Sequence, residues 1–490
     1  MKPVKILLFT LGVFLLLAGT MWLTPAGGIK IGEFTFHMPT TKEMLLDDEV
    51  EYADVSEILE HQFDIDSLVN MDVEVDSAFS DSVAEFIPGA SYDSLVAAIY
   101  KIELRDTGKI NLHRFFQTLH DSTLVRIMHY GDSQIEGDRI TAFIRNKFQV
   151  KFGGSGPGLR PALQPYDYVF SAVQANSENW KRYPVYGKVD STVEHDRYGV
   201  MGAFSRYAPP ASDTLPFKDS ILYDAELSIS KSDISYNLTK VYKHFRMFYG
   251  NAKRPVEMQL LVKSEPFLTD TLPAGLDYSV VECELPDSTD HISIRFSGFD
   301  SPDVYGIELA EQRGVIVDNI ALRGSSGTIF TKTDFLHSRK MYNDLKPALF
   351  LLQFGGNVMP YIKDEKAVKN YGRWFKSQIR RLQMMCPEAA IIVIGPSDMS
   401  TKEKDKYVTY EYLPTVVETL KEAALSTGCG FWNMYEAMGG YNSMPSWVNA
   451  NPELARPDYV HFSARGARLV ANMFYNALIF EYNNFLMEAN

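Results

Sequence analysis

The sequence predicts an α/β protein in which an antiparallel β-sandwich interrupts a doubly wound, mostly parallel sheet. Two observations lead to this fold class. Apolar segments of strand length alternate with amphipathic helical segments in two separated parts of the chain, which is typical of a parallel sheet with helices on both faces. Between these parts, short alternating segments are separated by Asp, Pro, Ser and Gly, which is typical of antiparallel strands.

The α/β elements follow one another in a regular order. Predicted strands lie at 122–131, 314–322, 348–355, 389–395 and 429–435. Predicted helices lie at 136–149, 333–345, 367–386, 411–428 and 464–482. The third helix illustrates the evidence, because Val368, Tyr371, Phe375 and Ile379 recur at the spacing of one helical face. The sandwich strands are predicted at 225–230, 245–250, 256–262, 278–285, 291–298 and 304–310.

The 490-residue composition fits folded domains, because 46% of the residues are hydrophobic and 13% are aromatic. The net charge of −14 originates in one segment, residues 43–100, which contains sixteen Asp and Glu and no Lys or Arg. No basic cluster is available for a phosphate backbone, so nucleic acid is not an expected partner. The three cysteines form no CxxC, and no HExxH motif occurs, so we expect no metal and no other cofactor.

Residues 1–25 are predicted to form a membrane anchor or a signal. Lys2 and Lys5 precede an uncharged, mostly apolar run of 18 residues from Ile6 to Leu23, which is long enough to cross a bilayer once. The lysines favour a cytoplasmic N-terminus with the rest of the chain outside. We favour an uncleaved single-pass anchor in the inner membrane with a periplasmic catalytic domain. The alternative is a cleaved signal and a soluble periplasmic protein.

The remaining chain is predicted to contain three parts. Residues 26–110 form an acidic stalk or linker, because like charges oppose compact packing. Residues 111–165 and 314–490 form the α/β domain, and residues 166–313 form the inserted β-sandwich.

Polar or glycine-containing motifs follow the predicted strands. They are "GDS" with Ser133, "GSSG" with Gly327, "GGN" with Asn357, and "DYVH" with Asp458 and His461. In open parallel sheets, ligand sites form beyond the carboxyl ends of the strands. We therefore expect these motifs to meet at one site.

The chemistry that needs this combination of residues is acyl transfer. A serine hydroxyl needs a histidine to accept its proton, and a carboxylate fixes the tautomer of that histidine. The anionic tetrahedral intermediate needs N–H donors. The predicted catalytic residues are Ser133, Asp458 and His461, and the predicted oxyanion donors are the N–H groups of Ser133 and Gly327 with the Asn357 amide. His129, Asp132, Asp138 and His337 are interpreted as structural.

The four motifs, in this order, resemble the blocks of the SGNH (GDSL-type) hydrolase superfamily, and this resemblance implies a flavodoxin-like sheet and the same residue roles. "HYGDSQ", "KFGGSGPG" and "FWNMYEAMGG" further resemble the periplasmic peptidoglycan O-acetylesterases, in which a carbohydrate-binding-like β-domain is inserted. Two departures concern the substrate. Gln134 stands where histidine is common in that group, and Ala321 stands where glycine is frequent.

The resemblance implies a serine esterase that removes O-acetyl groups from an envelope polysaccharide such as peptidoglycan. Two alternatives remain. The same triad could serve a polysaccharide O-acetyltransferase that works with a membrane acetyl-transfer protein. In the other alternative, the chain is a non-catalytic carbohydrate-binding protein and the sandwich is its functional part.

Overall fold

The computed structural model describes residues 3–23, 29–31, 34–36, 50–56, 58, 99–120, 124–211, 217–218, 220–287 and 289–489. The chain divides into two compact units, Met1–Glu51 and Tyr52–Asn490.

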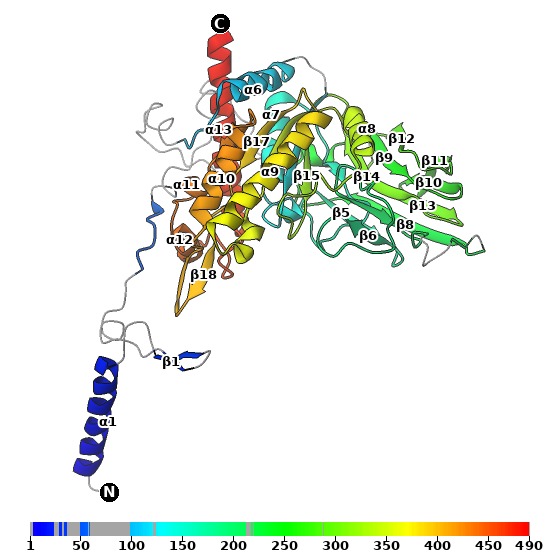
Figure 1. Cartoon of the computed structure of the whole chain (residues 1–490). Coiled ribbons are helices and arrows are strands. Elements are labelled where there is room, and N and C mark those ends of the chain that lie inside the picture. Colours follow the sequence, from blue (N-terminus) through cyan, green and yellow to red (C-terminus); the bar gives the residue numbers. More distant parts are fainter. Residues whose placement is uncertain are drawn as a thin grey trace. The chain divides into compact units, whose positions relative to one another are not determined.

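The N-terminal unit contains one long apolar helix, α1 (Pro3–Leu23) (Figure 1). Its window Pro3–Thr20 has a mean hydropathy of 2.0, so its length and composition suffice to cross a membrane. A short antiparallel pair, β1 (Ile29–Ile31) and β2 (Phe34–Phe36), follows the helix.

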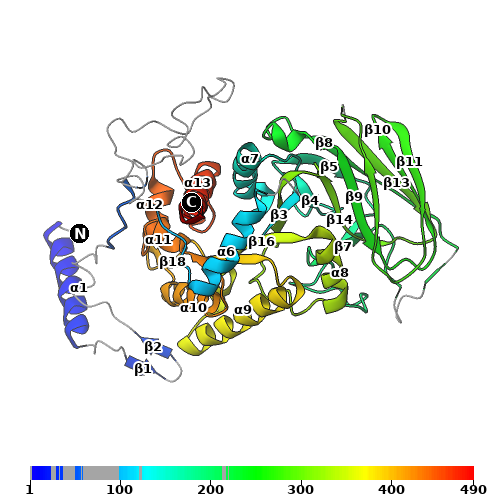
Figure 2. The same ribbon diagram turned by 90° about the horizontal axis from the view of Figure 1, so that it is seen from above.

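The centre of the larger unit is a five-stranded parallel sheet (Figure 2). Its spatial order is β15 (Gly314–Ala321), β3 (Leu124–Gly131), β16 (Pro347–Gln353), β17 (Ala390–Ile394) and β20 (Gly430–Trp432). All four pairings are parallel. Numbered along the chain, the order is 2-1-3-4-5, which is the flavodoxin-like arrangement. The predicted doubly wound sheet is therefore confirmed.

Helices cover both faces of this sheet, because alternate strand residues point to opposite sides. On one face, Met128 and Phe350 share a core with α8 (Phe335–Leu345), α9 (Glu365–Met385) and α10 (Leu413–Leu425). On the other face, Ile127 and Leu351 share a core with α6 (Asp106–Thr118), α7 (Thr141–Phe152) and α13 (Ala464–Ala489).

Shorter elements surround the carboxyl ends of the strands. The 3₁₀ helices η2 (Glu136–Asp138) and η4 (Gly356–Tyr361) follow β3 and β16. The hairpin β18 (Ser400–Glu403) and β19 (Lys406–Thr409) follows β17. Two short helices, α11 (Met434–Ala437) and α12 (Ser443–Asn449), follow β20.

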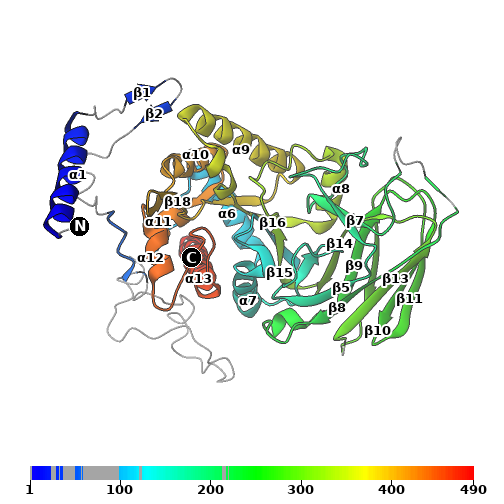
Figure 3. The same ribbon diagram turned by 90° about the horizontal axis from the view of Figure 1, so that it is seen from below.

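Two antiparallel sheets lie in the chain between α7 and β15, and they pack face to face (Figure 3). One sheet has the order β11 (Glu265–Leu272), β10 (Val256–Val262), β13 (His291–Gly298), β8 (Tyr223–Lys231) and β5 (Ala172–Asn176). The other has the order β12 (Ser279–Glu284), β9 (His244–Gly250), β14 (Asp303–Ala310), β7 (Ala203–Arg206) and β6 (Lys181–Pro184). The 3₁₀ helix η3 (Leu238–Lys240) connects β8 and β9.

The antiparallel pairing begins before the predicted boundary at residue 166, because β4 (Gly158–Arg160) pairs with β14. The two parts are also joined by a buried ion network. The Arg126 guanidinium on β3 contacts Asp318 on β15 at 2.7 Å and bonds to Glu308 on β14. Since a buried charge is costly unless it is paired, this network stabilises the packing of β14 on the parallel sheet.

The start of the α/β part differs from the predicted boundary at residue 111. The indole N–H of Trp432 donates to the Tyr100 carbonyl at 2.9 Å, and Ile102 is buried in the core. Helix α6 begins at Asp106 and buries Leu112 and Phe115. Residues 99–110 therefore pack on the sheet rather than belonging to a stalk, because their apolar side chains complete the core. Most of the remaining predicted stalk, namely residues 26–28, 32–33, 37–49, 57 and 59–98, lies outside the described residues.

Candidate active site

The predicted site residues gather where the strand order of the parallel sheet reverses. Ser133 follows β3, and Asn357 follows the adjacent strand β16. The connections that leave these two strands run to opposite sides of the sheet, so a crevice forms between their carboxyl ends. This is the usual ligand position in a doubly wound sheet.

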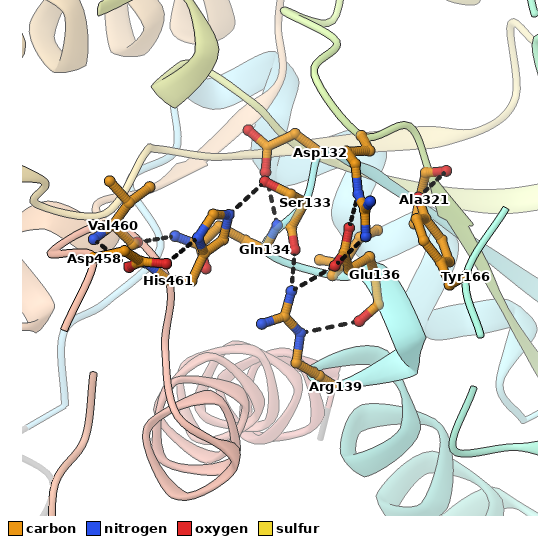
Figure 4. Close-up of polar contacts among 12 residues, drawn as sticks. Asp132, Ser133, Gln134, Glu136, Arg139, Tyr166, Ala321, Asp458, Val460 and His461 are labelled. Atoms are coloured by element: carbon orange, nitrogen blue, oxygen red, sulfur yellow. Dashed lines mark hydrogen bonds and ion pairs between the residues drawn. The ribbon is translucent and has the colours of Figure 1, made fainter. Parts of the chain in front are cut away.

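The structure brings the three predicted catalytic side chains together in one hydrogen-bonded line (Figure 4). Ser133 Oγ lies 2.8 Å from His461 Nε2. The other ring nitrogen, Nδ1, lies 2.9 Å from Asp458 Oδ2. With this connectivity, Nε2 can accept the serine proton while the carboxylate holds the proton on Nδ1.

The Asp-x-x-His spacing explains how one short loop supplies both partners of the serine. Asp458 Oδ1 accepts hydrogen bonds from the backbone N–H groups of Val460 at 3.0 Å and His461 at 2.9 Å. Partial burial raises the pKa of Asp458, but these bonds and the one from the imidazole outweigh it and lower the pKa below its ordinary value. Asp458 is therefore ionised where the imidazole needs a negative partner.

A hairpin supports this loop from outside. Tyr407 on β19 stacks on Tyr459 with 3.6 Å between ring centroids and 8° between ring planes. The backbone N–H of Ser400 on β18 donates to the Tyr459 carbonyl at 3.0 Å. Tyr459 has a φ of +58°, a conformation that non-glycine residues rarely adopt. These contacts hold the strained residue between Asp458 and His461.

The amide of Asn357 reaches the site but is engaged in this structure. Its Nδ2 atom donates to Asp132 Oδ2 at 2.9 Å and to the Ser325 carbonyl at 3.2 Å. Burial raises the pKa of Asp132 to about 6. The hydrogen bond to Asp132 orients the Asn357 amide. Because the same Nδ2 atom also donates to the Ser325 carbonyl, donation to an oxyanion requires the amide to leave that carbonyl.

Gly327 was predicted to be an oxyanion donor, but its surroundings are those of a packed loop residue. Its backbone N–H donates to Ser325 Oγ at 3.2 Å, and a Cβ atom at this glycine would lie 2.7 Å from the Phe354 ring. The residue is buried, and its N–H is used within the loop. Gly327 is thus placed as a packing glycine, because only a residue without a side chain fits against Phe354.

Gly324, three residues earlier, was not among the predicted oxyanion donors. Its surroundings are nevertheless those expected of a backbone N–H donor. It is exposed, and no atom lies within 4 Å of the position that a Cβ atom would take. Among the described residues, the N–H groups of Gly324 and Ser133 have no hydrogen-bond acceptor. The available signal in the sequence was that Gly324 lies only two residues after the predicted strand 314–322. In the structure, the Leu322 N–H at the end of this strand bonds to the Gly131 carbonyl, two residues before Ser133.

Two of the residues interpreted as structural, His129 and Asp138, have internal partners. His129 is fully buried between Thr141 Oγ1, at 2.9 Å, and Gln353 Oε1, at 3.1 Å. Burial lowers the pKa of His129 to about 4, so the ring is neutral. Asp138 is paired with Arg145 at 2.6 Å.

The structure gives no candidate metal centre in the parts of the chain that it describes. Within those ranges, no group of three or more His, Cys, Asp or Glu side chains could hold a metal ion. The three cysteines are free.

Similar solved structures were found, whereas no protein-family model and no curated protein sequence matches the chain. A peptidoglycan O-acetylesterase is similar over 78% of this chain and 99% of its own, with a TM-score of 0.58 and 19% sequence identity. An acetyl xylan esterase covers 33% of this chain and 81% of its own, at a TM-score of 0.26 and 15% identity. A family two carbohydrate esterase from Clostridium thermocellum is matched over 54% of this chain and 93% of its own, with a TM-score of 0.23 and 11% sequence identity.

The first of these similarities carries the argument about fold. Its TM-score is above 0.5, and it spans almost the whole of the esterase. The predicted SGNH hydrolase fold is therefore confirmed as a fold.

Proposed function

We propose that this chain is a serine esterase that removes O-acetyl groups from an envelope polysaccharide, with peptidoglycan as its substrate. The observation that carries the proposal is the continuous line Ser133–His461–Asp458, with contacts of 2.8 and 2.9 Å. The shared fold with a peptidoglycan O-acetylesterase supports it and suggests the substrate class.

In the proposed reaction, Ser133 Oγ attacks the acetyl carbonyl carbon while its proton passes to His461 Nε2. Asp458 stabilises the imidazolium that forms. The carbon–oxygen bond to the sugar then breaks, and the sugar oxygen takes the proton from His461. A water molecule gives a proton to Nε2 and attacks the acetyl-serine, so acetate leaves and Ser133 recovers its proton.

The proposed oxyanion donors differ in how ready they are in this structure. The N–H of Ser133 has no competing acceptor among the described residues, and neither has that of Gly324. Asn357 joins them if its amide turns from the Ser325 carbonyl. Gly324 therefore replaces Gly327 in the proposed set, since the Gly327 N–H is already bonded.

The proposed location is the inner membrane, with the catalytic unit in the periplasm. Helix α1 is apolar over the length of one span, and Lys2 precedes it. The positive N-terminal flank favours a cytoplasmic N-terminus. The N-terminal sequence of the mature protein tests this: retention of Lys5 supports the anchor, and a start near Gly27 indicates a cleaved signal.

The deciding experiment uses the full-length protein in detergent. Wild type, Ser133→Ala and His461→Ala are incubated with a chromogenic acetate ester and with O-acetylated peptidoglycan, and the products are measured by mass. Loss of one triad member typically costs several orders of magnitude in turnover. Ser377→Ala is the matched control, because this serine is exposed on α9, where its hydroxyl donates to the Trp374 carbonyl and accepts a 3.4 Å hydrogen bond from Gln378 Nε2.

The outcomes separate the three functional classes. Free acetate from wild type and its loss in both triad variants support the esterase. Acetylated oligosaccharide, formed when acceptors are added, identifies a transferase. Glycan binding without turnover by wild type would leave a binding protein, and wild-type turnover by Ser133→Ala would reject the assignment of the nucleophile.

A further inference from the structure

A short segment near the N-terminus, residues 52–56, packs on the larger unit beside α12. The Ala53 N–H donates to the Asn442 carbonyl at 3.3 Å, and the Ser446 hydroxyl donates to the Ala53 carbonyl at 2.6 Å. Val55 is 8% exposed and belongs to the core cluster that contains residues of α12. We call residues 52–56 the strap, because they continue the chain that leads from α1.

Asn442 connects the strap to the hairpin formed by β18 and β19. Its carbonyl accepts the bond from the strap, and its side-chain Oδ1 accepts a 3.0 Å hydrogen bond from the Thr409 N–H on β19. The Asn442 N–H in turn donates to Thr409 Oγ1 at 2.7 Å. Asn442 is 3% exposed, and its φ of +60° is a conformation that Asn adopts more readily than most residues with a side chain. One buried residue therefore joins the strap to the hairpin.

The hairpin continues the connection to the catalytic loop. Thr409 is paired in register with Ser400 on β18, and the Ser400 N–H donates to the Tyr459 carbonyl at 3.0 Å. Tyr407, two residues before Thr409, stacks on the Tyr459 ring at 3.6 Å between centroids. Since Tyr459 lies between the aspartate and the histidine of the triad, the contacts run without interruption from the strap to the catalytic side chains.

The catalytic loop depends on this support, because its own packing is limited. Asp458 is exposed, and Tyr459, Val460 and His461 are only partly buried. The positive φ of Tyr459 costs free energy unless surrounding contacts compensate for it. Segments with few buried contacts open locally more readily than the core does. Loss of hairpin contacts therefore acts first on the positions of Asp458 and His461.

The chain packs on the larger unit again at residues 99–104, and this second attachment has different partners. The Glu103 N–H donates to the Phe431 carbonyl at 2.8 Å, so the segment pairs with β20 at the edge of the parallel sheet. Ile99 is 8% exposed and belongs to the same core cluster as Val55. The two attachments thus bury one apolar residue equally, and they differ in the elements to which they are bonded.

We propose that the strap is a positioning element for the catalytic loop. Docked on Asn442, it holds the hairpin, and the hairpin holds Asp458 and His461 in line with Ser133. This inference rests on the esterase function proposed above. The strap acts through the contacts of the hairpin rather than on the substrate, so its release should change kcat and leave KM unchanged.

The test uses the full-length protein in detergent and the chromogenic acetate ester. Val55→Gln places a polar side chain in the core and should release the strap. We expect kcat per folded molecule to fall at least ~3-fold with KM unchanged, because small displacements of catalytic groups are costly. Val55→Ile keeps the apolar contact and should retain the wild-type kcat.

Ile99→Gln is the matched control. It introduces the same polar side chain at the same exposed fraction, so it should lower Tm as Val55→Gln does and leave kcat per folded molecule unchanged. Ser446→Ala is a second strap variant, which removes the hydrogen bond to the Ala53 carbonyl and keeps Val55. It should lower kcat in the same direction, and it decides the matter by the same criteria if Val55→Gln does not fold.

Hydrogen exchange provides a readout that does not require turnover. The Ser400 N–H is bonded to the Tyr459 carbonyl, and the Tyr459 N–H is bonded to the Arg456 carbonyl at 3.0 Å. Deuterium uptake is measured by mass in peptides that cover residues 400–409 and 456–461. We expect faster uptake in both peptides in Val55→Gln and not in Ile99→Gln, because release of the strap loosens these bonds locally.

Two results would overturn the positioning role. One is equal kcat per folded molecule in Val55→Gln and Ile99→Gln, and the other is unchanged uptake at residues 400–409 and 456–461 in Val55→Gln. A wild type without esterase turnover would count against the proposed function, and the exchange measurement would then still decide whether the strap holds the loop.

Discussion

The side-chain amide of Gln134 donates a 2.6 Å hydrogen bond to the backbone carbonyl of Val460, and this bond joins the loop of the nucleophile to the loop of the histidine. Gln134 follows Ser133, and Val460 precedes His461. The same amide also donates to Ser397 Oγ at 3.2 Å. Gln134 therefore fixes the distance between the loop of Ser133 and the loop of His461.

Replacement of this side chain should lower turnover more than stability. We expect Gln134→Ala to reduce kcat by roughly 10- to 100-fold, because small displacements of a catalytic pair are costly. The measurement is kcat with the chromogenic ester, with Tm measured on the same samples. Gln383→Ala is the matched control, since the Gln383 amide on α9 donates a similar 2.8 Å bond to a backbone carbonyl, that of Thr427. Equal kcat in both variants would contradict the positioning role.

The stacked pair Tyr407–Tyr459 should influence catalysis through the loop it supports. Tyr407→Ala is expected to lower kcat by roughly 3- to 10-fold, which corresponds to the energy of one aromatic pair. Tyr407→Phe keeps the ring and should restore wild-type kcat. Parallel kinetics of the two variants check this, and a Phe variant as slow as the Ala variant would show that stacking is not the cause.

Asn357 should affect the transition state rather than substrate binding. Asn357→Ala is expected to lower kcat by ~100- to 1,000-fold, or about 3–4 kcal/mol, with little change in KM. Tm should also fall, because Asp132 loses a hydrogen-bond donor. Turnover per folded molecule is therefore the deciding quantity. If it is unchanged, Asn357 only holds Asp132 and the Ser325 carbonyl in place.

Gly324 and Gly327 form a matched pair for identifying the backbone donor. Their φ values are +78° and +74°, so alanine meets similar backbone strain at both. Only at Gly327 would the added Cβ atom clash with a ring, at 2.7 Å from Phe354. We expect Gly327→Ala to lose more stability, and Gly324→Ala to lose more turnover per folded molecule. The reverse pattern in Tm and kcat would restore Gly327 as the donor.

Buried Asp398 should make stability depend on pH. Burial raises its pKa to about 6, against hydrogen bonds from the Met444 N–H and the Thr409 hydroxyl. Between roughly pH 4 and 6 the folded state keeps a proton that the unfolded state has lost. The contribution of this group to the free energy of unfolding therefore falls as pH rises through that window, by up to about 3 kcal/mol, and is constant above it.

Asp398→Asn should reduce this slope, to which Asp132 with its similarly raised pKa also contributes. It should also lower stability at every pH, because an amide cannot accept both hydrogen bonds. Urea unfolding of both proteins at several pH values between 4 and 7 measures the difference. Parallel pH curves would mean that Asp398 is not the titrating group.

The parallel core and the candidate catalytic residues could both be predicted from the amino-acid sequence. Apolar strands alternating with amphipathic helices have few solutions other than a helix-covered parallel sheet. Residues that follow such strands must meet at one edge, so the positions of Ser133, Asp458 and His461 along the chain are enough to place them together. Asp458 and His461 are only three residues apart in the chain. Their relative positions depend on local backbone geometry, which a sequence pattern can indicate.

The assignment of the backbone oxyanion donor could be made only from the tertiary structure. Gly324 and Gly327 differ in burial and in the direction of their N–H groups, and these depend on packing against Phe354. The packing of residues 99–110 on the sheet likewise depends on partners such as Trp432, which lies more than three hundred residues away in the sequence.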